Sequence, residues 1–161
     1  MKKSSTVMAF GTFDFLHAGH LHYLQSAKKL AGTAGKGAGK KGKTHGRGKL
    51  VVVVARDRVA LSEKGALPVN PEKDRLALVG ALRVVDVAVL GSESAAERFA
   101  EIKKQKPAVL VLGYDAREDE DVLTLRLSAA GIRPLPKIVR AKPYLHETNK
   151  SSLLRKRLPL V

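Results

Sequence analysis

The chain has 161 residues, a length that favours one compact domain whose core needs neither disulfides nor a structural metal. It contains no cysteine, which excludes disulfides, thiolate metal sites and a cysteine nucleophile and fits a cytoplasmic protein. The formal net charge of +15 predicts that the protein meets phosphate, in a nucleotide, a nucleic acid or an acidic lipid. The longest apolar runs are only long enough for strands, so we expect no membrane partner.

The first third of the chain predicts two buried strands, a helix between them and a glycine-rich insertion. Residues 6–10 (TVMAF) and 50–55 (LVVVVA) have the apolar composition of buried strands, and apolar residues at helical spacing predict a helix over residues 19–30. Residues 31–49 contain six cations, seven glycines and no large apolar side chain. Such a segment buries too little surface to offset its ordering entropy, so we expect a mobile insertion there.

The rest of the chain alternates predicted strands and helices. Residues 62–70 (SEKGALPVN) predict a loop leading to a helix that begins near Pro71, with Asn70 as its N-cap. Further strands are expected at residues 84–91, 108–113 and 137–141, and further helices at 93–106, from about 122 to Gly131, and at 149–158. This order predicts an α/β fold, a Rossmann-like doubly wound sheet of about five parallel strands with helices on both faces. Ligands of such sheets bind at the carboxyl ends of the strands.

Residues 37–44, GAGKKGKT, match the phosphate-loop pattern GxxxxGK[ST]. That pattern binds phosphate when a strand leads into the loop and a helix leaves it. Here it follows the first predicted helix and precedes the second predicted strand, which puts it at the wrong edge of the sheet. We therefore interpret it as part of the insertion.

The segment after the first strand, GTFDFLHAGH, has the composition of an anion site. His17 and His20 lie three residues apart where a helix begins, so their side chains can share one face while the free N–H groups of the helix point the same way. Gly11 permits close backbone approach, and Gly19 leaves room for a phosphate or a base. Surface histidines without a ligand, or a metal-binding pair, are the alternatives.

Several motifs resemble one known family. The segment GTFDFLHAGHLHYL resembles the first signature, GxFDxxHxGH, of the cytidylyltransferase-like branch of the HxGH nucleotidyltransferases. The segments VVVVARD, NPEKDRLALVGALRVVDVAVLG and LVLGYD most resemble archaeal FAD synthases, which are adenylyltransferases acting on FMN. The resemblance covers nearly the whole chain except the insertion, and it implies a single nucleotidyltransferase domain over residues 1–161.

The resemblance implies a mechanism of in-line nucleotidyl transfer. ATP would lie over the first and fourth strands with its triphosphate at the start of the first helix, and the FMN phosphate would attack the α-phosphorus to give FAD and pyrophosphate. His17 and His20 would donate hydrogen bonds to phosphate oxygens. Mg²⁺ would accompany ATP, bound by substrate oxygens and water, so no protein metal ligand is expected.

The same match implies the remaining site residues. The catalytic set is His17, His20, Lys150, Ser151 and Ser152, where the last three open a predicted helix in the place of the family's second signature, and Arg155 and Arg157 are candidate supports. The nucleotide-binding set is Gly11, Thr12, Phe13, Asp14, Ala18, Gly19, Arg75, Gly113, Tyr114 and Asp115.

Some of these residues have two interpretations. Asp14 either accepts backbone N–H groups to orient its turn, which we favour, or contacts the ligand. Arg75 either reaches the site or forms a structural salt bridge. Arg56 and Asp57 follow the second strand at the ligand-binding edge and are candidates for lining an acceptor pocket. Gly113, Tyr114 and Asp115 form either a ribose-binding edge or a plain surface turn.

Two classes of function compete with this interpretation. Among enzymes, a cytidylyltransferase acting on glycerol 3-phosphate or another polyol phosphate, or a phosphopantetheine adenylyltransferase, would share the first motif. Among proteins that are not enzymes, a nucleic-acid-binding module would suit the Gly/Lys-rich insertion and the basic tail of the chain. The sequence has no nucleic-acid-binding motif and only three Tyr, four Phe and no Trp, so nucleic acid is not expected as the main partner. A homodimer is what the family resemblance implies.

Overall fold

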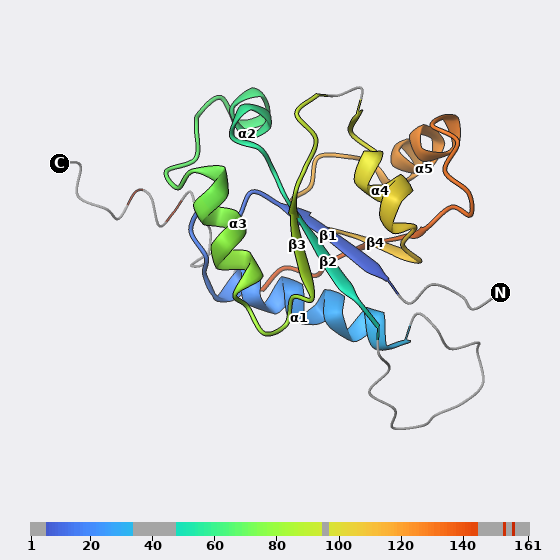
Figure 1. Cartoon of the computed structure of the whole chain (residues 1–161), viewed down its shortest axis with the longest axis horizontal. Coiled ribbons are helices and arrows are strands. Elements are labelled where there is room, and N and C mark those ends of the chain that lie inside the picture. The colour runs from blue at the N-terminus through green and yellow to red at the C-terminus, as the bar shows by residue number, and fades with distance from the viewer. Residues whose placement is uncertain (1–5, 34–47, 95–96, 145–152, 154–155, 157–161) are drawn as a thin grey trace.

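The computed structural model describes residues 6–33, 48–94 and 97–144, together with Leu153 and Lys156. Strands and helices alternate along this part of the chain (Figure 1). They are β1 (Val7–Gly11), α1 (Ala18–Thr33), β2 (Leu50–Val54), α2 (Asp57–Lys64), α3 (Glu72–Gly80), β3 (Val87–Leu90), α4 (Ala100–Gln105), β4 (Val109–Leu112), α5 (Glu120–Ala129) and β5 (Lys137–Arg140).

The strands form one parallel sheet in the order β3-β2-β1-β4-β5. The central strand β1 pairs with β2 from Val7 through Gly11, but with β4 only from Val7 through Ala9. β1 and β4 therefore stop pairing near their carboxyl ends, and the strand order reverses between these two strands. In Rossmann-like sheets, ligands bind in the crevice at such a switch point, outside the carboxyl ends of the strands. The predicted fold class is confirmed.

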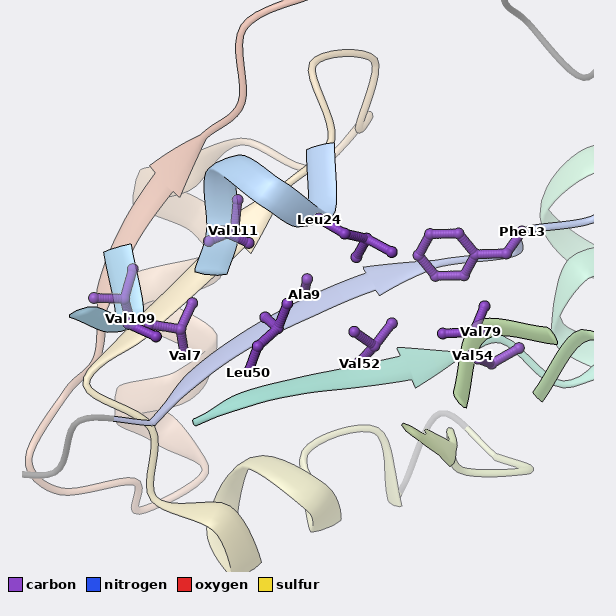
Figure 2. Packing of buried hydrophobic residues seen from close by; sticks show 12 residues of the cluster. Val7, Ala9, Phe13, Leu24, Leu50, Val52, Val54, Val79, Val109 and Val111 are labelled. Carbon is purple, nitrogen blue, oxygen red and sulfur yellow. The ribbon is translucent and has the colours of Figure 1, made fainter. Parts of the chain in front are cut away.

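Two buried clusters lie on opposite faces of the sheet. Side chains from alternate positions of the strands, such as Val7, Ala9 and Val52, pack with Leu24 of α1 and Val79 of α3 (Figure 2). The intervening positions pack on the other face with α4 and α5; they include Met8, Val51, Val53 and Leu110, which meet Ile102, Leu123 and Leu127. Because both faces are covered, β2 is the continuous apolar run expected of a buried parallel strand.

The helix α2 differs from the sequence-based expectation, which placed no helix between the strand at residues 50–55 and the loop at residues 62–70. Residues 57–64 are helical, with Asp57 in the first turn, Lys64 in the last turn and Gly65 (φ 74°) as a left-handed C-cap. These are standard helix start and stop signals, but the helix has only eight residues and one buried side chain, Ala60, so its apolar periodicity is weak.

Other boundaries also need correction. Asn70 is not the N-cap of α3, because Pro71 occupies that position with extended backbone (φ −56°, ψ 152°). The helix α4 is shorter than expected, and β3 begins at Val87 rather than at residue 84. The final predicted helix lies mostly outside the described residues.

The predicted insertion lies between α1 and β2, at the amino ends of the strands. Its residues 34–47, which include the phosphate-loop pattern at 37–44, lie outside the described residues. Its flanks show the context: α1 precedes the pattern and β2 follows it. At the far flank Gly48 lies directly against the α1 backbone, where an added Cβ would lie 1.9 Å from the carbonyl oxygen of Ala31.

The turn after β1 depends on the small size of Gly11. Phe13 adopts a left-handed backbone (φ 55°) that turns its ring back into the core, where it is 2% exposed. A Cβ on Gly11 would lie only 2.7 Å from Cζ of this ring. The space beside the Gly11 backbone is therefore occupied by the Phe13 ring.

We predict that Gly11→Ala lowers the free energy of unfolding by about 1–3 kcal/mol, because the buried ring has little room to move. Gly32→Ala is the matched control, since nothing lies within 4 Å of a Cβ added there in α1, and it should leave stability unchanged or slightly raised. Urea unfolding followed by circular dichroism measures both. Equal stability of the Gly11 variant and the wild type would contradict the packing described here.

Candidate active site

His17 and His20 lie side by side at the start of α1. Their rings stack with centroids 3.9 Å apart, and the Phe13 ring meets His20 edge-on at 5.2 Å. The backbone N–H of Gly19 donates to Nδ1 of His17 at 3.1 Å. Neutral His17 must then hold its proton on Nε2, so this nitrogen is a hydrogen-bond donor available to a ligand.

Burial keeps both imidazoles neutral near pH 7. It lowers the pKa of His20 to about 4, with a further contribution from His17, and it also lowers the pKa of His17. Nδ1 of His20 is buried and makes no hydrogen bond within the described parts of the chain. A buried polar atom without a partner is uncommon, and in a candidate site it marks a place for a ligand or water.

Lys64 adds a cation beside the histidines, and the sequence reasoning missed it. Its Nζ donates to Oγ1 of Thr12 at 3.0 Å, and its charge helps to lower the pKa of His20. Lys64 is the last residue of α2, so the contact became visible only once that helix was recognised. The signal available in the sequence was a lysine directly before a glycine C-cap, on the helix that follows β2.

Asp14 holds two loops together, the positioning role favoured from the sequence. Its carboxylate accepts the backbone N–H groups of Val69 (3.1 Å) and Asn70 (2.9 Å), and it is only 5% exposed. The Asn70 side-chain amide donates in return to the Asp14 carbonyl oxygen. The turn after β1 and the α2–α3 link therefore form one unit.

Arg75 is fully buried, so of its two interpretations the structure favours the structural salt bridge, made with Asp57, over a nucleotide contact. Its guanidinium donates to the carbonyl oxygens of Thr12, Ala55 and Asn70 and to the carboxylate of Asp57, 2.6 Å away. These acceptors come from the loops after β1 and β2 and from the α2–α3 link. Arg75 therefore holds these three segments together and has no exposed surface for a ligand.

Arg56 and Asp57 belong to the same support. The Asp57 backbone N–H donates to Glu72, and the Glu72 backbone N–H donates to Asp57, so each carboxylate caps the first turn of the other's helix. Arg56 donates to Glu72 at 2.8 Å, and these hydrogen bonds lower the pKa of the Glu72 carboxyl. The structure therefore uses both residues to join α2 to α3, and it does not show them lining an open pocket.

Phe13 also departs from its expected role. The whole residue is only 2% exposed, so Phe13 has almost no surface for a nucleotide. Thr12, Ala18 and Gly19 remain around the two histidines, and Ala18 is exposed. The structure brings these residues together at the start of α1, next to Lys64.

The loop after β4 contains Gly113, Tyr114 and Asp115, with Asp115 exposed at the edge of the sheet. A Cβ on Gly113 would lie 3.3 Å from Oδ1 of Asp115, so the glycine gives this carboxylate room to fold back. Arg140, at the end of β5, was not singled out from the sequence. Its guanidinium donates to the carbonyl oxygens of Gly113 (3.3 Å), Ala116 (2.9 Å) and Glu118 (2.8 Å), which fixes the loop.

Tyr23 of α1 fills the gap between β1 and β4. Its hydroxyl donates to the Val111 carbonyl oxygen at 2.8 Å and accepts the Phe10 backbone N–H at 3.2 Å. These groups lie just where the two strands stop pairing. Burial of the hydroxyl raises the pKa of Tyr23, so the hydroxyl keeps its proton. One helix thus fixes both the crevice and the two histidines.

The predicted phosphate-binding tail, Lys150, Ser151 and Ser152, lies outside the described residues, as do Arg155 and Arg157. Before it, the Tyr144 ring stacks on His22 of α1 with centroids 4.3 Å apart. The chain that leaves β5 therefore returns to the first turns of α1, two residues from His20.

Within residues 6–33, 48–94 and 97–144, no group of three or more His, Asp or Glu side chains is arranged to hold a metal ion. No helix in this described part of the chain is long and apolar enough to cross a membrane. The donors at the site are imidazoles, an ammonium, a hydroxyl and backbone N–H groups, a set suited to phosphate oxygens.

Comparison with known proteins identifies the class that this fold and site define. Residues 8–157 match the cytidylyltransferase-like family, and the chain belongs to that family. It is 40% identical over 152 residues to FAD synthase of Thermoplasma volcanium, covering 94% of this chain and 92% of that protein. It is 39% identical to FAD synthase of Methanohalophilus mahii and 35% identical to that of Pyrococcus abyssi, each over 94% of this chain and at least 90% of the relative.

A solved structure supports the fold assignment. The chain superposes with a TM-score of 0.70 and 41% identity on a Thermoplasma volcanium protein described as a lipopolysaccharide core biosynthesis protein. The match covers 86% of this chain and 97% of that one.

The His20 pKa generates a pH prediction. The unfolded chain binds a proton near pH 6.5 that the folded chain accepts only near pH 4. The free energy of unfolding should therefore fall as the pH is lowered from 6.5 to 4, by at most about 1.4 kcal/mol per pH unit from this group. Imidazole chemical shifts followed by NMR measure the pKa, and His20→Gln should show a shallower loss of stability. A His20 ring that titrates near 6.5 would refute the burial argument.

Proposed function

We propose that the protein is an adenylyltransferase that joins ATP and FMN to give FAD and pyrophosphate, that is, an FAD synthase. The observation behind this proposal is identity of about 40% to FAD synthases over nearly the full length of both chains. The stacked histidines at the start of α1, beside the crevice between β1 and β4, fit that chemistry.

The described residues suggest where ATP binds. The nucleoside lies over the β1–β4 crevice, where the exposed Asp115 accepts a ribose hydroxyl from a loop fixed by Arg140. The triphosphate lies at the start of α1, where the helix dipole and the Nε2–H of His17, oriented by the Gly19 N–H on Nδ1, favour an anion. Of the predicted nucleotide-binding residues, Phe13, Asp14 and Arg75 act by holding this surface in shape.

The chemical step needs charge stabilisation more than proton transfer. An FMN phosphate oxygen attacks the α-phosphorus of ATP, a new phosphorus–oxygen bond forms, and the bond to pyrophosphate breaks. His17 donates from Nε2 to phosphate oxygens, the His20 ring stacked on it is the second imidazole donor, and the Lys64 ammonium offsets negative charge next to Thr12. Bound Mg²⁺ would neutralise the triphosphate, coordinated mainly by substrate oxygens and water.

Some parts of the proposal remain predictions. Lys150, Ser151 and Ser152 would bind the β- and γ-phosphates and lie outside the described residues. A homodimer and a cytoplasmic location also remain predictions. A cytidylyltransferase for a polyol phosphate and a phosphopantetheine adenylyltransferase are the enzyme alternatives to exclude.

A substrate matrix tests the function. The purified protein is given ATP or CTP with Mg²⁺ and, in turn, FMN, glycerol 3-phosphate or phosphopantetheine, while pyrophosphate and product mass are measured. We expect FAD from ATP plus FMN and no product from the other combinations. Turnover of another pair, without FAD, would overturn the assignment.

Single histidine variants test the site. His17→Ala or His20→Ala should lower kcat by about 100-fold or more, the typical cost of losing one positioned donor to a transition-state charge. Gln25→Ala is the control, since it removes an exposed polar side chain from the same helix away from the two histidines, and kcat should stay within a few-fold of wild type. Near-normal kcat in both test variants, with the fold intact by circular dichroism, would mean that the site lies elsewhere.

A further inference from the structure

The link between α2 and α3, residues 65–70, exposes two large apolar side chains. Leu67 and Val69 are each 57% exposed, on either side of Pro68. Single apolar residues on a surface are ordinary, but two within one short segment beside an active site indicate a contact surface. We call Leu67 and Val69 the apolar ledge.

The backbone beneath the ledge is held in place by buried groups. The Asp14 carboxylate accepts hydrogen bonds from the N–H groups of Val69 and Asn70, and the Arg75 guanidinium donates one to the Asn70 carbonyl oxygen. Both side chains are at most 5% exposed. Pro68 restricts Leu67 to extended backbone, since the α region is disfavoured before a proline. The ledge is therefore ordered before a ligand arrives, which lowers the entropic cost of binding.

A cation lies directly before the ledge in the chain. Lys64 precedes the link, and its Nζ reaches Thr12 in the turn after β1. A ligand that fits both features has an apolar part for the ledge and an anionic part for the ammonium. FMN has this character, because a flat ring system is joined to a phosphate through a ribityl chain.

The order of the strands gives the two substrates separate places. The crevice proposed for the nucleoside of ATP lies between β1 and β4, whereas the ledge follows β2, on the other side of β1. The FMN phosphate must reach the α-phosphorus near the start of α1. Lys64 bonds to Thr12 and Val69 bonds to Asp14, so the ammonium and the ledge both border the turn that leads from β1 to α1.

We propose that Leu67 and Val69 bind the isoalloxazine ring of FMN while Lys64 binds its phosphate, so that the α2–α3 link selects the flavin acceptor. This subsite rests on the proposed function, since it assigns the second substrate of the same reaction. It makes the ledge the specificity determinant, distinct from the histidines that act on the triphosphate.

Equilibrium binding without ATP tests the ledge. Flavin fluorescence is titrated with wild type and with Leu67→Ser/Val69→Ser, using FMN and riboflavin, which has the ring but no phosphate. We expect the double variant to weaken both ligands by about tenfold or more, and Lys64→Met to weaken FMN much more than riboflavin. The conservative variant Leu67→Met/Val69→Ile should restore binding. The control Leu125→Ser removes an apolar side chain that is 70% exposed on α5 and should change neither affinity.

Kinetics and oligomeric state complete the test. The double variant should raise KM for FMN by about tenfold and leave KM for ATP within twofold. Unchanged flavin affinity, or an equal rise in both KM values, overturns the proposal. Dissociation of a wild-type dimer by the double variant, with flavin affinity retained, would assign the ledge to a subunit interface instead. Wild type that neither binds flavin nor makes FAD would refute the proposed function, whereas FAD synthesis unaffected by the ledge variants would refute only the ledge.

Discussion

The buried guanidinium of Arg75 is the interaction on which the site depends. One side chain satisfies three carbonyl oxygens and one carboxylate from three separate loops. These segments lie far apart in the chain, and the guanidinium fixes their mutual arrangement through one shared set of hydrogen bonds. The buried positive charge of Arg75 is tolerated because the guanidinium is paired with the Asp57 carboxylate and donates to three carbonyl oxygens. The turn after β1, α2 and the α2–α3 link are consequently joined into one hydrogen-bonded unit.

The burial of the two histidines and the position of Lys64 explain how a site with neutral imidazoles suits a strongly charged substrate. Imidazolium groups in the empty site would repel each other at a centroid separation of 3.9 Å, and burial would add to that cost. Neutral rings avoid the penalty, and the approach of a triphosphate would favour their protonated forms. Positive charge is instead supplied at the rim by Lys64, which remains close to water. The protein thus keeps charge stabilisation available without destabilising the empty site.

The sequence predicted what local patterns and periodicity determine. The sheet with helices on both faces follows from buried strands alternating with amphipathic segments, and His17 and His20 follow from their spacing at a helix start. The sequence left the role of Arg75 open between a ligand contact and a salt bridge, and it did not predict the roles of Lys64, Arg140 and Tyr23. Each of these roles depends on contacts between segments far apart in the chain. An arginine that binds a ligand and one that binds three carbonyl groups look the same in a sequence. Only the tertiary structure separates a residue that touches the substrate from one that shapes the loop.

The insertion between α1 and β2 has a different consequence. Gly48 lies against the Ala31 carbonyl, and Lys28 donates to the Gly48 carbonyl oxygen at 2.9 Å, so the chain re-enters the domain beside the helix it left. Entry and exit are thereby fixed at the amino ends of the strands, opposite the catalytic edge. A change in the length or composition of residues 34–47 does not have to move any residue of the site. This connection is accordingly where the fold can accept new sequence, a graft point for a tag or a foreign domain in an otherwise small enzyme.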